Sequence, residues 1–243
     1  MKKVLGILAV AGLAATAMAR PDANLSLQYS TDDSAWSDNI NVDVGTAKVF
    51  VRVIMSIPDS YYGISGARYN ITSGAGEWDL GGNDSIDLTP GKGNVTDGRT
   101  AGFDFGGQTQ QIFETGNQLR IDAKGDSGNS AGAGISTSQN TPGALGTNFN
   151  TSKVAIVYKF AINLHAAHVA GDVITLRIMD GGNNGSPDQI TSFKAYETNT
   201  STAGVQLTGE TGDTAVLTFV PVPGPGALAL AGLGGLAAAR RRR

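Results

Sequence analysis

The sequence predicts an all-β protein, a β-sandwich or jelly roll of about nine short strands. Runs of β-branched residues and runs with period-two alternation recur along most of its length. Glycine contributes 34 of 243 residues and clusters between these runs, as turns between short strands require. Sustained helical periodicity is missing from the same stretches. We therefore expect one β-sandwich domain over residues 20–219.

The predicted strands follow one another in two groups separated by a polar stretch. Pro58 ends one of the strongest runs, and Ile64, Tyr69 and Ile71 in the next run are expected core residues. A run at 153–162 is apolar on both faces, which predicts a central strand. The strand candidates, about nine of which the sandwich is expected to use, are 24–30, 48–57, 63–71, 77–80, 102–105, 118–123, 153–162, 172–179, 190–196, 204–208 and 215–219.

Residues 124–150 are rich in Gly, Ser, Asn and Thr and poor in apolar residues. Loops of this length without structure are uncommon inside compact domains and are often functional or disordered. The composition favours a mobile insert between the two groups of strands.

Three parts of the predicted sandwich resemble a cohesin-type or carbohydrate-module-type domain. They are the strand 49–57 running into 63–67, the strand 155–162, and the hairpin strand 172–179 with the terminal strand 215–219. In cohesins such strands form a jelly roll that binds a partner module called dockerin. The resemblance supports the fold and does not by itself assign a dockerin partner to this chain.

The N-terminus has the three parts of a secretory signal peptide. A positive Met1-Lys2-Lys3 segment precedes an apolar stretch at 4–14, and Ala17-Met18-Ala19 provides the small residues that signal peptidase requires. Cleavage after Ala19 would make Arg20 the first mature residue, and cleavage after Ala17 is the alternative. Residues 1–19 are therefore a predicted signal peptide.

Residues 220–243 combine a Pro/Gly hinge, an apolar run at 227–239 and a basic end. This layout resembles the PEP-CTERM sorting tail of Gram-negative-type bacteria, although Val222 stands where that family usually has glutamate. The resemblance implies processing by an exosortase-type membrane protease. The residues that carry it are Pro221, Val222, Pro223, Gly224, Arg240, Arg241, Arg242 and Arg243.

The apolar run of the tail is short for a membrane span. Its thirteen residues reach about 20 Å as a helix, against a bilayer core of about 30 Å. It therefore predicts a hydrophobic sorting helix that anchors transiently in the inner membrane, with the arginines held in the cytoplasm. The domain before it would lie at the outer surface or outside the cell. A disordered basic tail is the alternative.

The charge of the chain argues against one class of partner, and its lack of cysteine excludes disulfide bonds. Without Lys2, Lys3 and Arg240 to Arg243, the chain has 12 basic and 21 acidic residues, a net charge of −9. An acidic domain of this kind repels phosphates, so we expect no nucleic-acid partner. Cysteine is absent from the sequence, so disulfides do not stabilise the domain.

The candidate metal ligands are few. His165 and His168 are three residues apart, which on a helical turn places both rings on one face, and Asp172 is the nearest carboxylate. A Gly/Asn-rich turn with Asp180, Asn184 and Asp188 partly matches a calcium-binding loop, but Gly182 and Thr191 replace two of its ligands. Turn chemistry is the favoured explanation of the Asp and Asn residues, and a solvated loop that of the histidines. We expect no cofactor and leave a weak structural calcium site open.

Catalytic residues are not indicated by the pattern. Glutamates at 77, 114, 197 and 210 are scattered, and a glycosidase needs two carboxylates facing each other. The sequence therefore favours a non-catalytic exported surface or extracellular-matrix protein, structural, adhesive or associated with polysaccharide. A secreted sandwich-fold glycan hydrolase is the alternative. Aromatic side chains in a row on one sheet would support the first hypothesis, and a carboxylate pair in a cleft the second.

Overall fold

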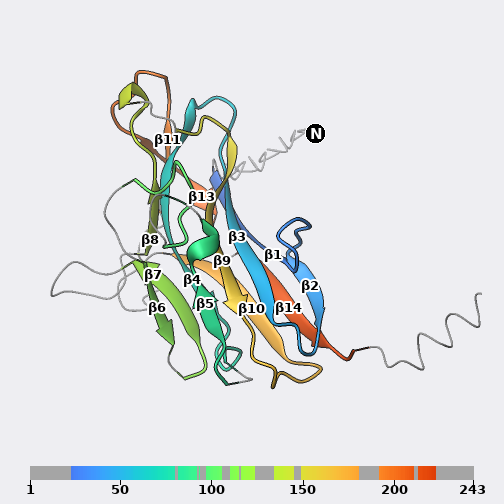
Figure 1. Ribbon diagram of the computed structural model, residues 1–243. Coiled ribbons are helices and arrows are strands. Elements are labelled where there is room, and N and C mark those ends of the chain that lie inside the picture. Colours follow the sequence, from blue (N-terminus) through green and yellow to red (C-terminus); the bar gives the residue numbers. More distant parts are fainter. Residues whose placement is uncertain are drawn as a thin grey trace, which may run out of the picture.

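The computed structural model describes residues 23–79, 82–91, 93, 97–105, 110–114, 116–123, 134–144, 149–180, 192–210 and 213–222. These residues form two packed β-sheets (Figure 1), which confirms the predicted β-sandwich. The predicted cleavage residues Ala17, Ala19 and Arg20 and the tail from Pro223 onward lie outside the described residues. No helix in the described part is long and apolar enough to span a bilayer.

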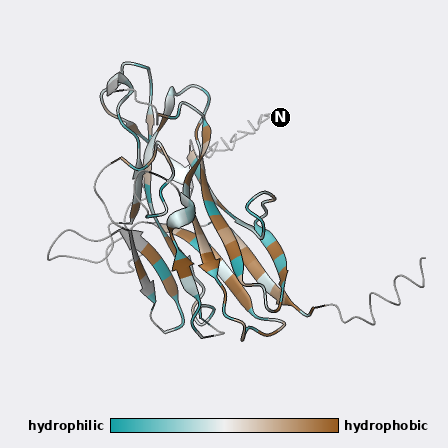
Figure 2. Cartoon of the chain, in the orientation of Figure 1, coloured by the Kyte–Doolittle hydropathy of each residue, from teal (hydrophilic) through white to brown (hydrophobic). Residues whose placement is uncertain are grey.

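The first sheet has the strand order β13-β1-β3-β9-β5. Its long members are β1 (Ala23–Ser30), β3 (Lys48–Ser56) and β9 (Val154–Asn163), with β5 (Ser85–Asp87) and β13 (Gly209–Glu210) at the edges. On β3, Val49, Val51, Val53 and Met55 are fully buried and alternate with half-buried residues. Figure 2 shows brown, apolar bands along the strands of both sheets. Strand β9 is central, as the sequence predicts.

The second sheet has the main order β12-β11-β4-β10-β14-β2. It consists of β4 (Gly63–Ser73), β10 (Val173–Asp180), β11 (Ser192–Tyr196), β12 (Val205–Leu207), β14 (Thr214–Val220) and β2 (Asn39–Asp43). Strands β2 and β14 run parallel, and the other neighbours in this order are antiparallel. Strands β6 (Gln110–Glu114), β7 (Leu119–Ala123) and β8 (Ile135–Ser138) extend the sheet beside β4.

Strand β4 organises the second sheet because four strands pair with it. Residues 66–68 pair with both β8 and β11, so these two strands lie on opposite edges of β4. Further along, residues 71 and 72 pair with both β7 and β10. The first half of β4 is thus the middle of a four-stranded surface, β8-β4-β11-β12.

The structure confirms the core residues predicted on β4 but differs from the sequence prediction at two expected strands. Ile64, Tyr69 and Ile71 are fully buried, as predicted. The strand expected at 77–80 is wrong: residues 75–79 form a turn in which Asp79 has a φ of 56°, and Leu80 is outside the described residues. The strand expected at 102–105 is reduced to a single bridge between Asp104 and Ser138.

The described part also contains strands that the sequence reading missed. They include β2, β5, β6 and β13. The described residues therefore form fourteen strands, where the sequence predicts about nine. Within the predicted insert 124–150, the structure has β8 and the 3-10 helix η2 (Pro142–Ala144). A second 3-10 helix, η1 (Thr89–Gly91), follows β5. Residues 124–133 and 145–148 of the insert lie outside the described residues.

Candidate functional site

An open groove of about 530 Å³ lies on the surface formed by β8, β4, β11 and β12. Its lining comes from five separate parts of the chain and is dominated by polar side chains and small residues. The lining residues are Ser65, Gly66, Ala67, Arg68, Phe105, Ser136, Thr137, Ser138, Gln139, Thr141, Lys194, Tyr196, Ala203, Gly204 and Gln206.

Strand register determines which side chains share the outer face of this surface. Gly66 pairs with Ser138 on one side and with Lys194 on the other, and Lys194 pairs in turn with Gln206. Paired residues in a sheet project to the same face. Ala67 and Phe193, one position away, are buried in the core, so this row points outward.

A second row lies two residues further along β4. Arg68 pairs with Ser136 of β8, and both project to the same outer face as Gly66. Strand geometry places neighbouring rows about 7 Å apart. Arg68 and Lys194 are therefore diagonal neighbours on adjacent strands, and both are exposed.

Gly66 and Gly204 keep the groove hollow. A Cβ atom on Gly66 would lie 2.4 Å from the backbone oxygen of Thr137, and one on Gly204 would lie 2.4 Å from Oγ of Ser65. Any larger residue at either position would therefore collide with the wall of the groove. The neighbouring backbone at Gly66 and the Ser65 side chain at Gly204 leave no room for a Cβ atom, which explains why both positions are glycine.

The wall near the start of β4 is fixed by hydrogen bonds. The Gln139 side-chain amide donates from Nε2 to the carbonyls of Ile64 (2.6 Å) and Asn150 (2.8 Å), and its Oε1 accepts from Asn150 N–H (2.5 Å). The Tyr196 hydroxyl donates to the carbonyl of Gln139. Because these groups are buried and satisfied, this wall is preorganised rather than adaptable.

Phe105 is the one exposed aromatic residue among those lining the groove, with 54% of its surface accessible. Its backbone is held at both polar atoms: its N–H donates to the carbonyl of Ser138 (3.1 Å), and its carbonyl accepts from Ser138 Oγ (2.8 Å) and Arg99 Nη1 (3.4 Å). Arg99 is itself buried and paired with Asp97 at 2.7 Å. The exposed ring therefore projects from a rigid support. A row of aromatic side chains, which would have been the clearest sign of a sugar-binding face, does not line this groove.

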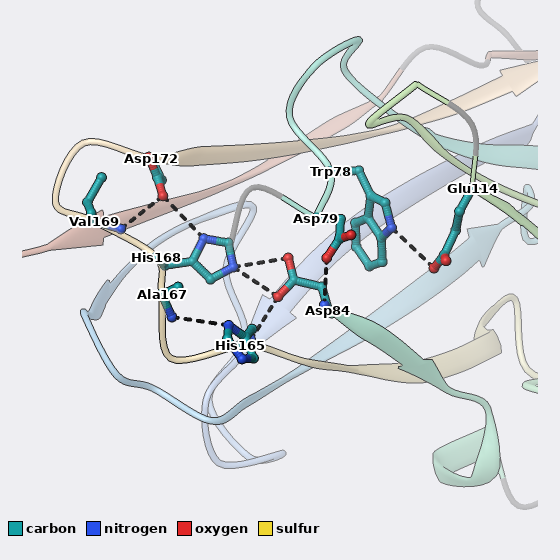
Figure 3. A network of polar contacts seen from close by, with 9 residues as sticks. All are labelled: Trp78, Asp79, Asp84, Glu114, His165, Ala167, His168, Val169 and Asp172. Atoms are coloured by element: carbon teal, nitrogen blue, oxygen red, sulfur yellow. Dashed lines mark hydrogen bonds and ion pairs between the residues drawn. The ribbon is translucent and has the colours of Figure 1, made fainter. Parts of the chain in front are cut away.

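The predicted histidine pair occupies a different place, between the ends of the two sheets (Figure 3). His168 is 1% exposed, and its Nε2 lies 3.0 Å from both carboxylate oxygens of Asp84. On the other side of the ring, Nδ1 lies 3.3 Å from Oδ2 of Asp172. Each ring nitrogen of this buried histidine therefore faces a carboxylate.

His165 does not share this arrangement. It is exposed, its backbone N–H donates to Asp84 (2.7 Å), and its ring Nδ1 accepts from Ala167 N–H (3.4 Å). The segment between the two histidines is a turn rather than a helix, so their rings do not lie on one helical face. The sequence prediction of Asp172 as a neighbour of His168 holds, whereas Asp84 was missed because it lies 84 residues away in the chain.

The structure does not bring the metal candidates together into a site among the residues it describes. No group of three or more His, Cys, Asp or Glu residues there is arranged to hold a metal ion. Asn184 and Asp188 lie outside the described residues, and Asp180 is described only through its backbone at the end of β10. The structural calcium site stays a prediction.

Two of the scattered glutamates, Glu77 and Glu197, do not converge. Glu77 lies just beyond the last residue of β4 and accepts a hydrogen bond from Thr175 N–H (2.8 Å). Glu197 lies at the opposite end of β4, because it follows Tyr196, which pairs with the first residue of that strand. The eleven residues of β4 place these two positions on the order of 30 Å apart. Glycosidase carboxylates lie within about 10 Å of each other. Glu114 accepts from the indole N–H of Trp78 (3.2 Å) and supports the core (Figure 3).

The fold and the groove define a β-sandwich with a preformed polar surface on one sheet. No protein-family profile and no curated protein sequence matches the chain. Among solved structures, it is similar to the seventh ScaB type I cohesin of Pseudobacteroides cellulosolvens, with 12% identity, 84% of this chain and 95% of that chain covered, and a TM-score of 0.46.

Two further cohesins show the same level of similarity. The OlpA cohesin of Clostridium thermocellum, solved in complex with a dockerin, has 8% identity over 81% of this chain and 99% of that chain, with a TM-score of 0.44. A type III cohesin of the ScaE cell-surface anchoring scaffoldin of Ruminococcus flavefaciens has 10% identity over 83% and 89%, with a TM-score of 0.40. Similarity at this level transfers no partner to this chain.

Proposed function

We propose that this chain is a non-catalytic exported module that holds extracellular polysaccharide in the groove on β8, β4, β11 and β12. The observation that carries the proposal is the lining of that groove: hydroxyl, amide and cationic groups on a preorganised sheet surface, with no carboxylate among the described residues that line it. Hydroxyl and amide groups form the hydrogen bonds that sugar hydroxyls offer. Without a carboxylate the groove can bind a glycan but lacks the acid–base pair that cleaves one.

The shape of the groove fits a chain rather than a small buried ligand. It lies open on the sheet surface, so a polymer can lie across the strands without being enclosed at its ends. Phe105 at the rim offers an apolar ring face against which a sugar ring can pack. Export through the predicted signal peptide, and sorting through the predicted tail by an exosortase-type protease, would deliver this surface to the outside of the cell.

The direct test is binding of the purified mature chain to immobilised polysaccharides, both neutral and acidic. Ser136→Tyr inserts a bulky ring from β8 into the groove, and Thr72→Tyr adds the same ring to the outward face of β4 outside it. We expect Ser136→Tyr to weaken binding about tenfold, a change of about 1.4 kcal/mol, and Thr72→Tyr to leave it unchanged. Both variants should keep the wild-type melting temperature within a few degrees.

The same samples distinguish the hydrolase alternative. A binding module releases no reducing sugar ends on prolonged incubation with the bound polymer. Release of reducing ends that is lost in the Ser136→Tyr variant would identify a glycan hydrolase and overturn the proposal. Failure to bind any polysaccharide in the panel would overturn it as well.

A further inference from the structure

The groove differs in charge from the rest of the domain. The chain without its two targeting segments has a net charge of −9, yet the charged residues that line the groove are both cationic, Arg68 and Lys194. A cationic spot on an acidic protein is a local feature of the surface and not a consequence of overall composition. Its field favours an anionic group at this point over the rest of the surface.

The register places the two cations around an empty position. Gly66 has no side chain, and on the outer face it is flanked by Ser138 on β8 and Lys194 on β11, with Arg68 two residues further along β4. Arg68 and Lys194 are diagonal neighbours, which places their stems about 7–8 Å apart. Long flexible cationic side chains at this separation can both reach a single anionic group above Gly66.

Neither cation is neutralised in the described part of the chain. Lysine and arginine side chains elsewhere in the described part do have carboxylate partners, such as Asp87 for Lys48, Asp97 for Arg99 and Asp33 for Lys159. No ion pair between residues of the described ranges includes Arg68 or Lys194. Glu197, although close in sequence to Lys194, does not line the groove. A ligand anion would therefore not have to displace an internal partner among these residues.

We infer that the groove recognises an acidic saccharide unit, one that carries a carboxylate or sulfate group, through Arg68 and Lys194. This inference rests on the proposed polysaccharide-binding function and names the class of sugar. The anionic group lies above Gly66 between the two cations, Ser136, Ser138 and Gln206 contact the sugar hydroxyls, and the Phe105 ring packs at the rim. Arginine adds a planar pair of N–H donors that matches carboxylate and sulfate oxygens.

The test measures affinity of the purified mature chain for three soluble probes: oligogalacturonate, dextran sulfate and neutral dextran, each at low and high salt. The double variant Arg68→Gln/Lys194→Gln removes both charges and keeps side-chain length and polarity. Arg177→Gln is the matched control, because Arg177 is an exposed cation on β10 of the same sheet and is not part of the groove lining. Circular dichroism verifies that all variants fold.

We expect an acidic probe to bind more tightly than neutral dextran, with an affinity that falls at high salt. The double variant should lose about tenfold in affinity for that probe, and Arg177→Gln should match wild type. Preference for oligogalacturonate identifies a carboxylated sugar, and preference for dextran sulfate a sulfated one.

Two outcomes would overturn the inference in distinguishable ways. Equal binding of neutral and acidic probes, with no effect of the double variant, removes the acidic specificity but leaves the polysaccharide function in place. Equal loss in the double variant and in Arg177→Gln shows general attraction to surface charge rather than a site in the groove. If no probe binds and the immobilised polysaccharides also fail, the proposed function itself falls.

Discussion

His168 lies flat against Phe219, with ring centroids 4.0 Å apart and an angle of 9° between the planes. Phe219 belongs to β14, whereas the carboxylate of Asp84 that faces His168 precedes β5 in the other sheet. This one imidazole therefore joins the two sheets through an apolar contact and a polar one. The neighbouring Asp79 carboxylate accepts from the backbone N–H of Asp84 (2.7 Å) and fixes that loop.

Replacement of His168 should destabilise the protein more than any change at His165. His168→Leu leaves the buried Asp84 carboxylate without its ring partner, which by analogy with broken buried ion pairs costs about 3 kcal/mol. His165 is exposed, and His165→Leu should change the free energy of unfolding by less than about 0.5 kcal/mol. Urea denaturation at neutral pH measures both.

The pairing of His168 with Asp84 has its own control. The double variant Asp84→Leu/His168→Leu removes both partners, so it leaves no Asp84 carboxylate buried without its ring partner. It should therefore lose less free energy of unfolding than His168→Leu alone. If the double variant is instead less stable than the single one, Asp84 contributes through other contacts, such as the N–H of His165.

Three buried tyrosines predict a loss of stability at alkaline pH. Burial raises the pKa of Tyr29, Tyr69 and Tyr158 well above the ordinary value, which is about 10. Such groups bind their protons more tightly in the folded state, so their contribution is complete below the unfolded pKa and is lost as the pH rises toward the folded one. We therefore expect the free energy of unfolding to fall above about pH 10.

Tyrosinate absorbance measured alongside circular dichroism checks this prediction. Part of the tyrosinate signal should appear only together with the loss of β-structure. Tyr158→Phe is the informative variant, because the Tyr158 hydroxyl has no hydrogen-bond partner within the described residues. The variant should have about the wild-type free energy of unfolding at neutral pH, and this free energy should fall less at alkaline pH than it does in the wild type. Full tyrosine ionisation in the folded state would contradict the prediction.

The sequence predicts the class of fold well because alternation reports burial directly. On β3 the apolar residues at every second position are those that the structure buries fully. Strand β8 was missed because its Ile-Ser-Thr-Ser sequence has only one large apolar residue. The strand forms because it pairs with β4, and this long-range pairing leaves no signal in the local sequence. The turn at 75–79 was misread as a strand because Trp78 suggests β-structure, although it is buried from a turn.

The groove could not be predicted from the sequence, because it depends on register. Arg68 and Lys194 each stand at an outward position in their own strand, and this much follows from alternation. That they lie on adjacent strands around Gly66 follows only from the pairing of β4 with β11. Residues 126 positions apart carry no local signal of this proximity. The same holds for Asp84 and His168.

The last prediction concerns Arg240 to Arg243, which lie outside the described residues. The apolar run before them is short and rich in Ala and Gly, so retention in the membrane should depend on the basic end. Each arginine at the bilayer centre costs about 2.5–3.5 kcal/mol on insertion scales. Replacing all four by serine should release the exported protein in soluble form with its C-terminus intact, whereas replacement by lysine should preserve retention and later trimming near Pro223. Fractionation followed by intact-mass measurement separates these cases. A serine variant that is retained and trimmed like wild type would show that the arginines do not determine sorting.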